Sequence, residues 1–325
     1  MTRSVAIIGA GQIGFAATHA FCTEAWDVTI LSRTRPAWLQ FPQQWRAYDA
    51  GVDPPPRADA VLDTIAYDAA DVSHYDPDCI GRLIVVSSAS VYCDDQGRTL
   101  DEGPVNGYPE FAGAITEHQS TVKAGPESYS TRKVRMEECV RALFGERATI
   151  LRPCAIYGQW SRHPREWWFV KRLLDGRAHI PLIFGGQSQF QTSDVGAIAA
   201  TAEASASLGV GGIFNIADAD APSVREIGEA IAACLDKDVE FVGLEEVGLI
   251  GRTPWSVPRP FIVSSARAAV MTGKQSCSYA DRMPLAVQWL HHHAPADWRV
   301  TFPQLAAYPW DLFDYAVEDR FFASL

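Results

Sequence analysis

The chain has 325 residues, of which 47% are hydrophobic, and a formal net charge of −11 at pH 7. This acidic balance argues against nucleic acid or an anionic membrane as the main partner, so anionic ligands must bind through local positive features. We find no apolar run of about 18 residues that could span a membrane. Because the chain enters a strand without a basic leader and cleavage site, we expect a cytoplasmic protein. The seven cysteines are scattered without a C-x-x-C pair, which indicates reduced core thiols rather than disulfides or a zinc site.

The first feature along the chain is a short apolar strand, residues 5–8, followed by glycines at G-x-G-x-x-G spacing and a helical run over 15–24. In such a unit Gly9 permits a tight turn, Gly11 lets the backbone approach a pyrophosphate, and Gly14 lets the helix pack closely on the strand. The free N–H groups of the helix N-terminus then bind phosphate. We predict a dinucleotide-binding loop whose contacts to the cofactor come from Gly9, Gly11, Gln12, Ile13 and Gly14.

The second predicted strand, residues 27–31, ends in Ser32 and Arg33, where this type of fold meets the adenosine ribose. An NAD-selective site usually has a carboxylate at this place. Here Arg33 can pair with a 2′-phosphate and Arg35 can assist it. We therefore predict NADP as the cofactor, with NAD as the alternative if Arg33 is only a surface arginine.

The rest of the sequence predicts a doubly wound, Rossmann-type α/β fold, because apolar strands alternate with helix-length segments. Further strands are expected at 60–66, 82–88 and 148–151, a helix at 129–144, an irregular excursion at 36–58 and a polar, glycine-rich loop at 94–127. We predict a dinucleotide-binding domain over 1–158 and a smaller, mainly substrate-binding lobe over 159–325. Within that lobe, residues of about 189–217 are expected to be able to pack back on the first domain.

A Tyr/Lys pair carries the predicted chemistry. Tyr129 and Lys133 are four residues apart, so they share one face of a helix. An ammonium beside a phenol lowers its pKa, which would let the tyrosine exchange a proton with a substrate alcohol. Ser88 lies at the end of the preceding strand, where a parallel sheet faces the nicotinamide, and a serine there can hydrogen-bond the same substrate oxygen. A solvated helix face is the alternative interpretation of the pair.

Taken together, the glycine loop, the S-S-x-S-V-Y segment ending at Tyr92, Y-x-x-x-K, the segment 151–158 and the Q-T-S-D-V segment at 191–195 make the chain resemble a known family. This is the extended short-chain dehydrogenase/reductase family of NAD(P)-dependent epimerases and dehydratases. The resemblance implies that Ser88, Tyr129 and Lys133 are catalytic, with Tyr129 and Lys133 also contacting the cofactor. It also places Thr64 and Ala66 at the cofactor.

Several positions depart from the family pattern. Ala155 stands where nucleotide-sugar enzymes often have a phosphate-binding Asn, and Gln187 stands where some epimerases have an Arg. Arg252 is left as a candidate ligand for a substrate diphosphate. Ser90 and Trp160 are the other candidate substrate contacts. The tryptophan cluster at 160, 167 and 168 either stacks a flat substrate group or forms the seam between the lobes. The aromatic residues at 308, 310 and 321–322 are interpreted as packing anchors.

We predict an NADP-dependent reductase of a small polar substrate, sugar-like or a nucleotide sugar, with Tyr129 as acid/base. The first alternative is an epimerase or dehydratase that cycles a bound NAD(P), and the second is an inactive, cofactor-gated binding protein. No metal is expected, because the His291–His293 run is interpreted as a polar helix end. The oligomeric state is left open, with a homodimer as one expectation.

Overall fold

The computed structural model describes residues 2–39, 44–245 and 248–324. In this part of the chain, seven parallel strands form a central sheet in the order β10-β6-β5-β4-β1-β2-β3. They are β1 (Ser4–Ile8), β2 (Asp27–Ser32), β3 (Trp45–Ala47), β4 (Ala58–Asp63), β5 (Ile80–Val86), β6 (Ala148–Pro153) and β10 (Gly212–Ile216). The strand order reverses between β1 and β4, so the predicted Rossmann-type sheet is confirmed. Ligands of such sheets bind in the crevice outside the carboxyl ends of the strands at this point.

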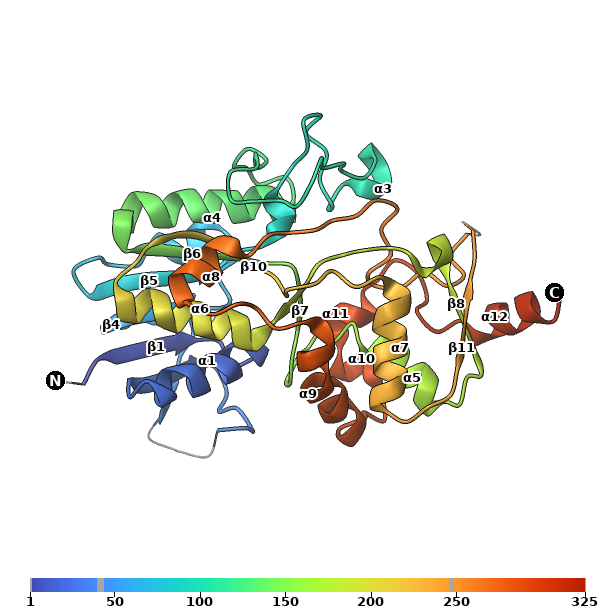
Figure 1. Cartoon of the computed structure of the whole chain (residues 1–325). Helices are drawn as coiled ribbons and strands as arrows, with labels where there is room; N and C mark the ends of the chain where they lie inside the picture. Colours follow the sequence, from blue (N-terminus) through green and yellow to red (C-terminus); the bar gives the residue numbers. More distant parts are fainter. Residues whose placement is uncertain (1, 40–43, 246–247, 325) are drawn as a thin grey trace.

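Helices cover both faces of the sheet (Figure 1). One face packs on α4 (Tyr129–Phe144), with α2 (Ala69–Val72) against it. The opposite face packs on α1 (Gln12–Thr23) and α6 (Val195–Leu208), with α8 (Ala266–Thr272) against α6. Because both faces are buried, the strands are almost continuously apolar, as in β1, where residues 5–8 are all buried.

A second hydrophobic core lies in the lobe drawn on the right of Figure 1. Its helices are α5 (Trp167–Leu174), α7 (Val224–Cys234), α9 (Tyr279–His292), α10 (Trp298–Thr301) and α11 (Pro303–Ala306). Two short parallel pairs accompany them, β7 (Ala155–Tyr157) with β9 (Thr192–Asp194) and β8 (His179–Leu182) with β11 (Glu240–Gly243). The last helix, α12 (Tyr315–Phe322), is tied to α5 by the buried Arg172–Glu318 ion pair.

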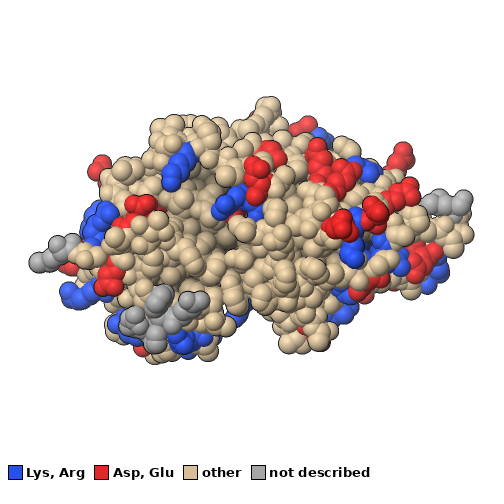
Figure 2. All heavy atoms as spheres, turned by 60° about the horizontal axis from the view of Figure 1, so that its bottom comes forward, with Lys and Arg blue, Asp and Glu red and all other residues tan. Residues whose placement is uncertain are grey.

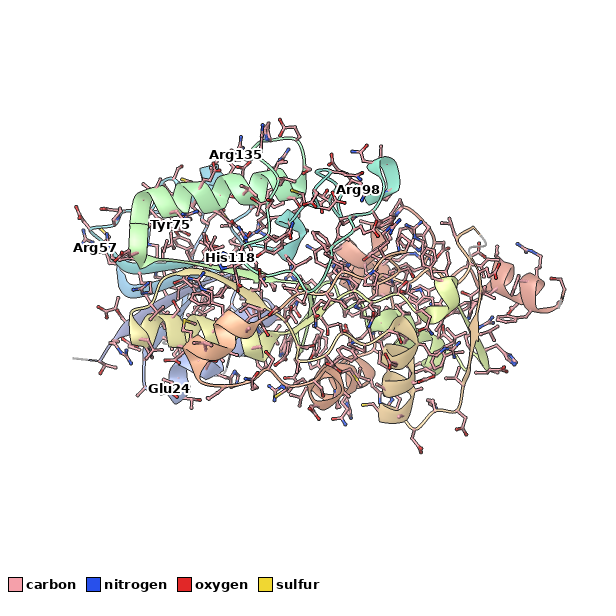
Figure 3. The ribbon with its side chains drawn as sticks, turned by 45° about the horizontal axis from the view of Figure 1, so that its top comes forward. Glu24, Arg57, Tyr75, Arg98, His118 and Arg135 are labelled. Atoms are coloured by element: carbon pink, nitrogen blue, oxygen red, sulfur yellow. The ribbon has the colours of Figure 1, made fainter. Side chains whose placement is uncertain are left out.

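The long segment between β5 and α4 holds one short helix, α3 (Gly103–Asn106), and extends beside the start of α4. Asp101 in this segment accepts a hydrogen bond from the Ser130 backbone N–H at 2.8 Å, which fixes the segment to α4. In Figure 3, Arg98 and His118 mark this segment, and Arg135 marks α4. The segment therefore lies next to the first turn of the helix that carries Tyr129.

The structure corrects two strand predictions. The segment 36–58, predicted to be irregular, contains the edge strand β3. Among the described residues β3 pairs with β2 alone, and its sequence has no alternating apolar pattern. The strand expected to reach Ala66 ends at Asp63, because the Asp63 carboxylate accepts from the backbone N–H groups of Ile65 (2.8 Å) and Ala66 (2.9 Å) and so turns the chain. The helix predicted at 129–144 is confirmed with both its bounds.

The surface carries charges of both signs, interspersed with broad areas that carry none on the face shown in Figure 2. Among the described residues, no helix is long and apolar enough to cross a membrane. Cys22 and Cys277 are exposed. The prediction that the cysteines are core thiols is therefore wrong for these two.

Candidate active site

The glycine loop has the geometry that a dinucleotide requires. Gly9 adopts a φ of +103°, and a Cβ at this position would lie 2.2 Å from Thr64 Oγ1. A Cβ on Gly14 would lie 2.1 Å from the Gly9 carbonyl oxygen, so α1 can pack this closely only with glycine there. A Cβ on Gly11 would meet nothing within 4 Å, which leaves open space over the N-terminus of α1. These features fit a pyrophosphate held against the helix N-terminus.

Two further side chains, those of Gln12 and Trp38, lie at this loop. Gln12 begins α1 and lines the main cleft, and its buried Oε1 has no hydrogen-bond partner among the described residues. Ile13 is buried behind it. The Trp38 indole N–H donates to the Ala10 carbonyl at 3.1 Å, and its ring packs edge-on against Phe15 at 5.4 Å. Trp38 therefore lies against the glycine loop, a contact that no motif in the sequence signals.

At the end of β2, the structure separates the three residues predicted to bind the adenosine ribose. Arg33 is exposed, and no ion pair or hydrogen bond of its side chain is found in the described ranges. Arg35 donates to the Leu39 carbonyl at 3.0 Å, so one of its N–H groups is already engaged. The Ser32 hydroxyl is also engaged, since it accepts from Trp45 Nε1 at 3.0 Å. Arg33 is thus the cation available to a 2′-phosphate at this strand end.

Two of the three predicted catalytic residues, Ser88 and Tyr129, line one cleft. Ser88 and Tyr129 both face a cavity of ≈ 670 Å³ that opens at the carboxyl ends of the strands. Ser88 caps a short 3₁₀ turn, η2 (Ala89–Val91), and its Oγ accepts from the Ser90 backbone N–H at 3.1 Å. Its own proton can be donated to the Tyr129 phenol or to a ligand oxygen in the cleft. Ser90 lines the same cleft, and its Oγ lies 2.9 Å from the Ser130 hydroxyl.

Lys133 lies one helical turn behind Tyr129 and is buried. Its ammonium donates to the carbonyl of Ala66 at 2.6 Å and to the carbonyl of Val86 at 2.9 Å, and so joins the turn after β4 to the end of β5. It also lies 5.7 Å from the centre of the Tyr129 ring. Burial lowers the pKa of Lys133 to about 8, against the charges of Asp63 and other carboxylates, so the ammonium persists at neutral pH.

The expected lowering of the tyrosine pKa is not seen in the ligand-free protein. Burial raises the pKa of Tyr129 to about 12, while the hydrogen-bonding hydroxyl of Ser88 and the charge of Arg165 oppose this rise and Asp101 adds to it. Lys133 is not among the main groups that shift the pKa of Tyr129. Since 38% of the Tyr129 side chain is exposed, its surroundings change when a ligand enters the cleft.

Two of the predicted substrate contacts, Arg252 and Trp160, lie in different parts of the structure. Arg252 lines the cleft, where its Nη2 donates to the Tyr108 hydroxyl at 3.2 Å and its guanidinium lies 4.4 Å from the Trp310 ring centre. Trp160 does not line the cleft. It lies between Phe15 of α1 (6.3 Å) and Trp289 of α9 (5.2 Å), in a seam between the two lobes. It occupies this seam because its left-handed backbone (φ +64°) turns the chain after β7.

The other departures from the family pattern are also located. Trp167 and Trp168 are buried in the core of the second lobe and not in the seam. Ala155 is buried in β7 and Gln187 is exposed, and neither belongs to the cleft lining in the part of the chain that the structure describes.

Four further side chains in the cleft lining are not predicted as site residues from the sequence. Arg165 and His163 enter the cleft from the segment between β7 and α5, and Tyr308 and Trp310 enter from the segment after α11. Tyr308 packs on His163 (5.7 Å) and on Trp310 (4.9 Å). Tyr308 and Trp310 pack against the core of the second lobe, as expected of packing anchors, and they also line the cleft. The basic character of residues 162–165 was a signal, but nothing in the sequence shows which of these side chains faces Tyr129.

No protein-family model and no curated protein sequence matches the chain. Solved structures with the same fold include the dTDP-glucose 4,6-dehydratase of Bacillus anthracis in complex with NAD, at 15% identity and a TM-score of 0.66, with 90% of this chain and 97% of that chain covered. The UDP-N-acetylglucosamine 4-epimerase of Bacillus cereus matches at 14% identity and a TM-score of 0.65, with 88% and 99% covered. The UDP-glucuronic acid 4-epimerase of Bacillus cereus, in complex with UDP-glucuronic acid and NAD, matches at 15% identity and a TM-score of 0.63, with 89% of this chain and 99% of that chain covered. The chain therefore has the fold of the extended short-chain dehydrogenase/reductase-type epimerases and dehydratases.

Proposed function

We propose that the chain is a nicotinamide-nucleotide-dependent oxidoreductase that acts on a carbinol carbon of a sugar-like substrate and cycles its cofactor, as an epimerase or dehydratase does. The observation that carries this proposal is the cleft that Ser88, Tyr129 and Gln12 share, with Lys133 directly behind. The sequence alone favoured net reduction. The named activities of the structural neighbours favour cycling.

A bound nicotinamide would supply the acceptor and donor of the hydride. Tyr129 takes the proton of the substrate alcohol and later returns it, and Ser88 orients the same oxygen through its O–H. Because the pKa of Tyr129 is about 12 in the ligand-free protein, proton transfer requires a change in its surroundings. A cationic nicotinamide and the neighbouring Lys133 would supply this change by stabilising the phenolate.

NADP is the cofactor that we propose, on the strength of Arg33. The end of β2 carries no carboxylate that would repel a 2′-phosphate, and Arg33 is exposed beside it. Two of the solved neighbours named above are complexes with NAD, so NAD is the second candidate. Net reduction of a ketone by exchangeable NADPH remains the alternative function, and Arg33 is the observation that favours it.

The experiment that tests this function is the release of cofactor from the purified chain. Protein is denatured, and its supernatant is examined for nicotinamide absorbance and fluorescence. Retained NAD(P) in near-stoichiometric amount supports cycling, whereas a cofactor-free chain that binds and releases NADPH supports net reduction. A chain that neither retains nor binds a nicotinamide nucleotide would contradict both.

A further inference from the structure

Arg165 is a cation in the cleft without a partner. It follows β7 and lines the same cavity as Ser88 and Tyr129, with its guanidinium 5.7 Å from the Phe190 ring centre. Among the described residues, its side chain forms no ion pair and no hydrogen bond, and its Nε is shielded from solvent. Arg165 is half-buried, and a partly desolvated charge of this kind is stabilised when a counter-charge approaches it.

Three other arginines of the chain show such compensation by a carboxylate. Arg152 forms two hydrogen bonds with Glu137, and Arg172 pairs with Glu318 at 2.6 Å. Arg98 pairs with Asp94 at 2.7 Å. Arg165 differs from them because the space in front of it is open cleft. The missing counter-charge is therefore expected on the ligand.

His163 provides a neutral hydrogen-bond donor beside Arg165. It lies two residues upstream in the same cleft wall, and its Nε2 is buried without a partner among the described residues. Burial and the charge of Arg165 lower the pKa of His163 to about 3, so the imidazole is neutral and can donate one N–H. Asp101 also lines the cleft, but its Oδ2 accepts from the Ser130 backbone N–H rather than from Arg165.

The position of Arg165 points to the reacting end of the cleft. Arg165, Tyr129 and Cys154 line the same cleft, and the charge of Arg165 opposes the rise in pKa that burial gives the phenol and the thiol. Arg252 is instead held beside Tyr108 and Trp310. The two arginines therefore serve different parts of a ligand.

We propose that Arg165, with the neutral His163 beside it, binds an oxyanion that the substrate carries close to the carbinol carbon facing Tyr129. This inference rests on the proposed function for the identity of that carbon. The ligand chemistry is a carboxylate or a phosphate, which a guanidinium can bind through two parallel hydrogen bonds. The substrate would thus be an acidic sugar or a sugar phosphate rather than a neutral sugar.

Three hexoses that differ at one carbon test the proposal: glucuronate, glucose 6-phosphate and glucose. Each is titrated calorimetrically into the full chain, with and without nicotinamide nucleotide. We expect one of the two acids to bind roughly tenfold to a hundredfold more tightly than glucose, the range of a charge-assisted hydrogen bond. Whichever acid does so identifies the oxyanion as a carboxylate or a phosphate.

Two variants assign the effect. Arg165→Met should bring the affinity for that acid down to the level of glucose, and Arg165→Lys should restore part of it. Arg162→Met is the matched control, because Arg162 is exposed in the same segment and is not part of the cleft lining. The thermal unfolding of each variant shows that it folds.

Equal affinity of the wild type for all three hexoses, no measurable binding of either acid, or an undiminished preference in Arg165→Met would overturn the inference. Failure of the proposed function is a separate result: the chain would bind no nicotinamide nucleotide, while the hexose titrations without cofactor could still show the preference for an acid.

Discussion

The ammonium of Lys133 lies 5.7 Å from the centre of the Tyr129 ring, yet its two hydrogen bonds go to the backbone carbonyls of Ala66 and Val86. In the ligand-free protein the lysine therefore joins the turn after β4 to the end of β5, and burial raises the pKa of Tyr129 to about 12. A cofactor ribose that competed for the ammonium would release it from these carbonyls. The Tyr/Lys pair is accordingly a site that a ligand has to activate.

The first prediction concerns Tyr129. Tyr129→Phe should lower turnover by roughly 10² to 10⁴, the usual range for the loss of a general acid/base, because the ring keeps its place while the proton donor is lost. Steady-state kinetics and a cofactor titration measure the two effects separately. Cofactor affinity should be nearly unchanged. Tyr67→Phe is the control, since the Tyr67 ring lies 5.5 Å from that of Tyr129 but does not belong to the cleft lining. Wild-type turnover in Tyr129→Phe would remove this residue from the mechanism.

The second prediction compares three serines at the end of β5. Ser88→Ala should lower turnover by roughly tenfold or more, the cost of about one hydrogen bond to the reacting oxygen. Ser90→Ala and Ser87→Ala should have smaller effects, because Ser90 bonds to Ser130 and the buried Ser87 hydroxyl has no partner in the described residues. Turnover numbers under saturating substrate decide the order. Similar losses in all three variants would mean that another serine, or none, orients the substrate.

The third prediction concerns pH and the buried Glu166, which is 1% exposed and lies 3.4 Å from the Tyr279 hydroxyl. Burial raises the pKa of Glu166 from 4.5 to about 7, and Asp218 adds to the rise. The folded state therefore binds more protons than the unfolded state between pH 4.5 and 7, so this group makes stability fall as pH rises through that window. The shift corresponds to roughly 3 kcal/mol, at about 1.4 kcal/mol per unit.

Glu166→Gln should reduce this fall, because the amide stays neutral at every pH. Urea denaturation at pH 5 and pH 8 gives the difference in unfolding free energy for the wild type and the variant. The exposed Glu138→Gln is the control and should leave the difference unchanged. A pH dependence in Glu166→Gln equal to that of the wild type would show that Glu166 is ionised without cost.

The first half of the fold could be predicted because its elements are specified locally. The helix at 129–144 starts at a capping box, in which Ser128 Oγ accepts from the Thr131 N–H at 3.3 Å and Thr131 Oγ1 accepts from the Ser128 N–H. The glycine loop needs Gly9 and Gly14 for steric reasons that the spacing already expresses. By contrast, β3 is three residues long and bonds to one neighbour only, and its position follows from tertiary pairing with β2.

The substrate side of the site could not be predicted for a related reason. Arg165 and Trp310 are 145 residues apart, and only the packing of the second lobe brings both to the cleft. Trp160 shows the converse: an aromatic residue near a basic segment is typical of a binding site, but its positive φ turns the chain toward Phe15 and Trp289. Chemistry carried by a motif is local, whereas the walls of this cleft depend on distant loops.

The last prediction concerns the choice between NADP and NAD. Arg33 is exposed at the end of β2, while Arg35 is bound to the Leu39 carbonyl and Ser32 to Trp45. A charge-assisted contact from Arg33 to a 2′-phosphate is worth roughly 1.5–3 kcal/mol, or roughly a ten- to hundredfold preference for NADP. Arg33→Ala should remove most of this preference and leave the affinity for NAD almost unchanged, because NAD lacks the phosphate. Arg35→Ala is the matched control and should keep the preference. Calorimetric titration of both cofactors into the three proteins measures it. If the wild type binds NAD as tightly as NADP, Arg33 is a surface arginine, and the remaining support for net reduction over cycling is lost.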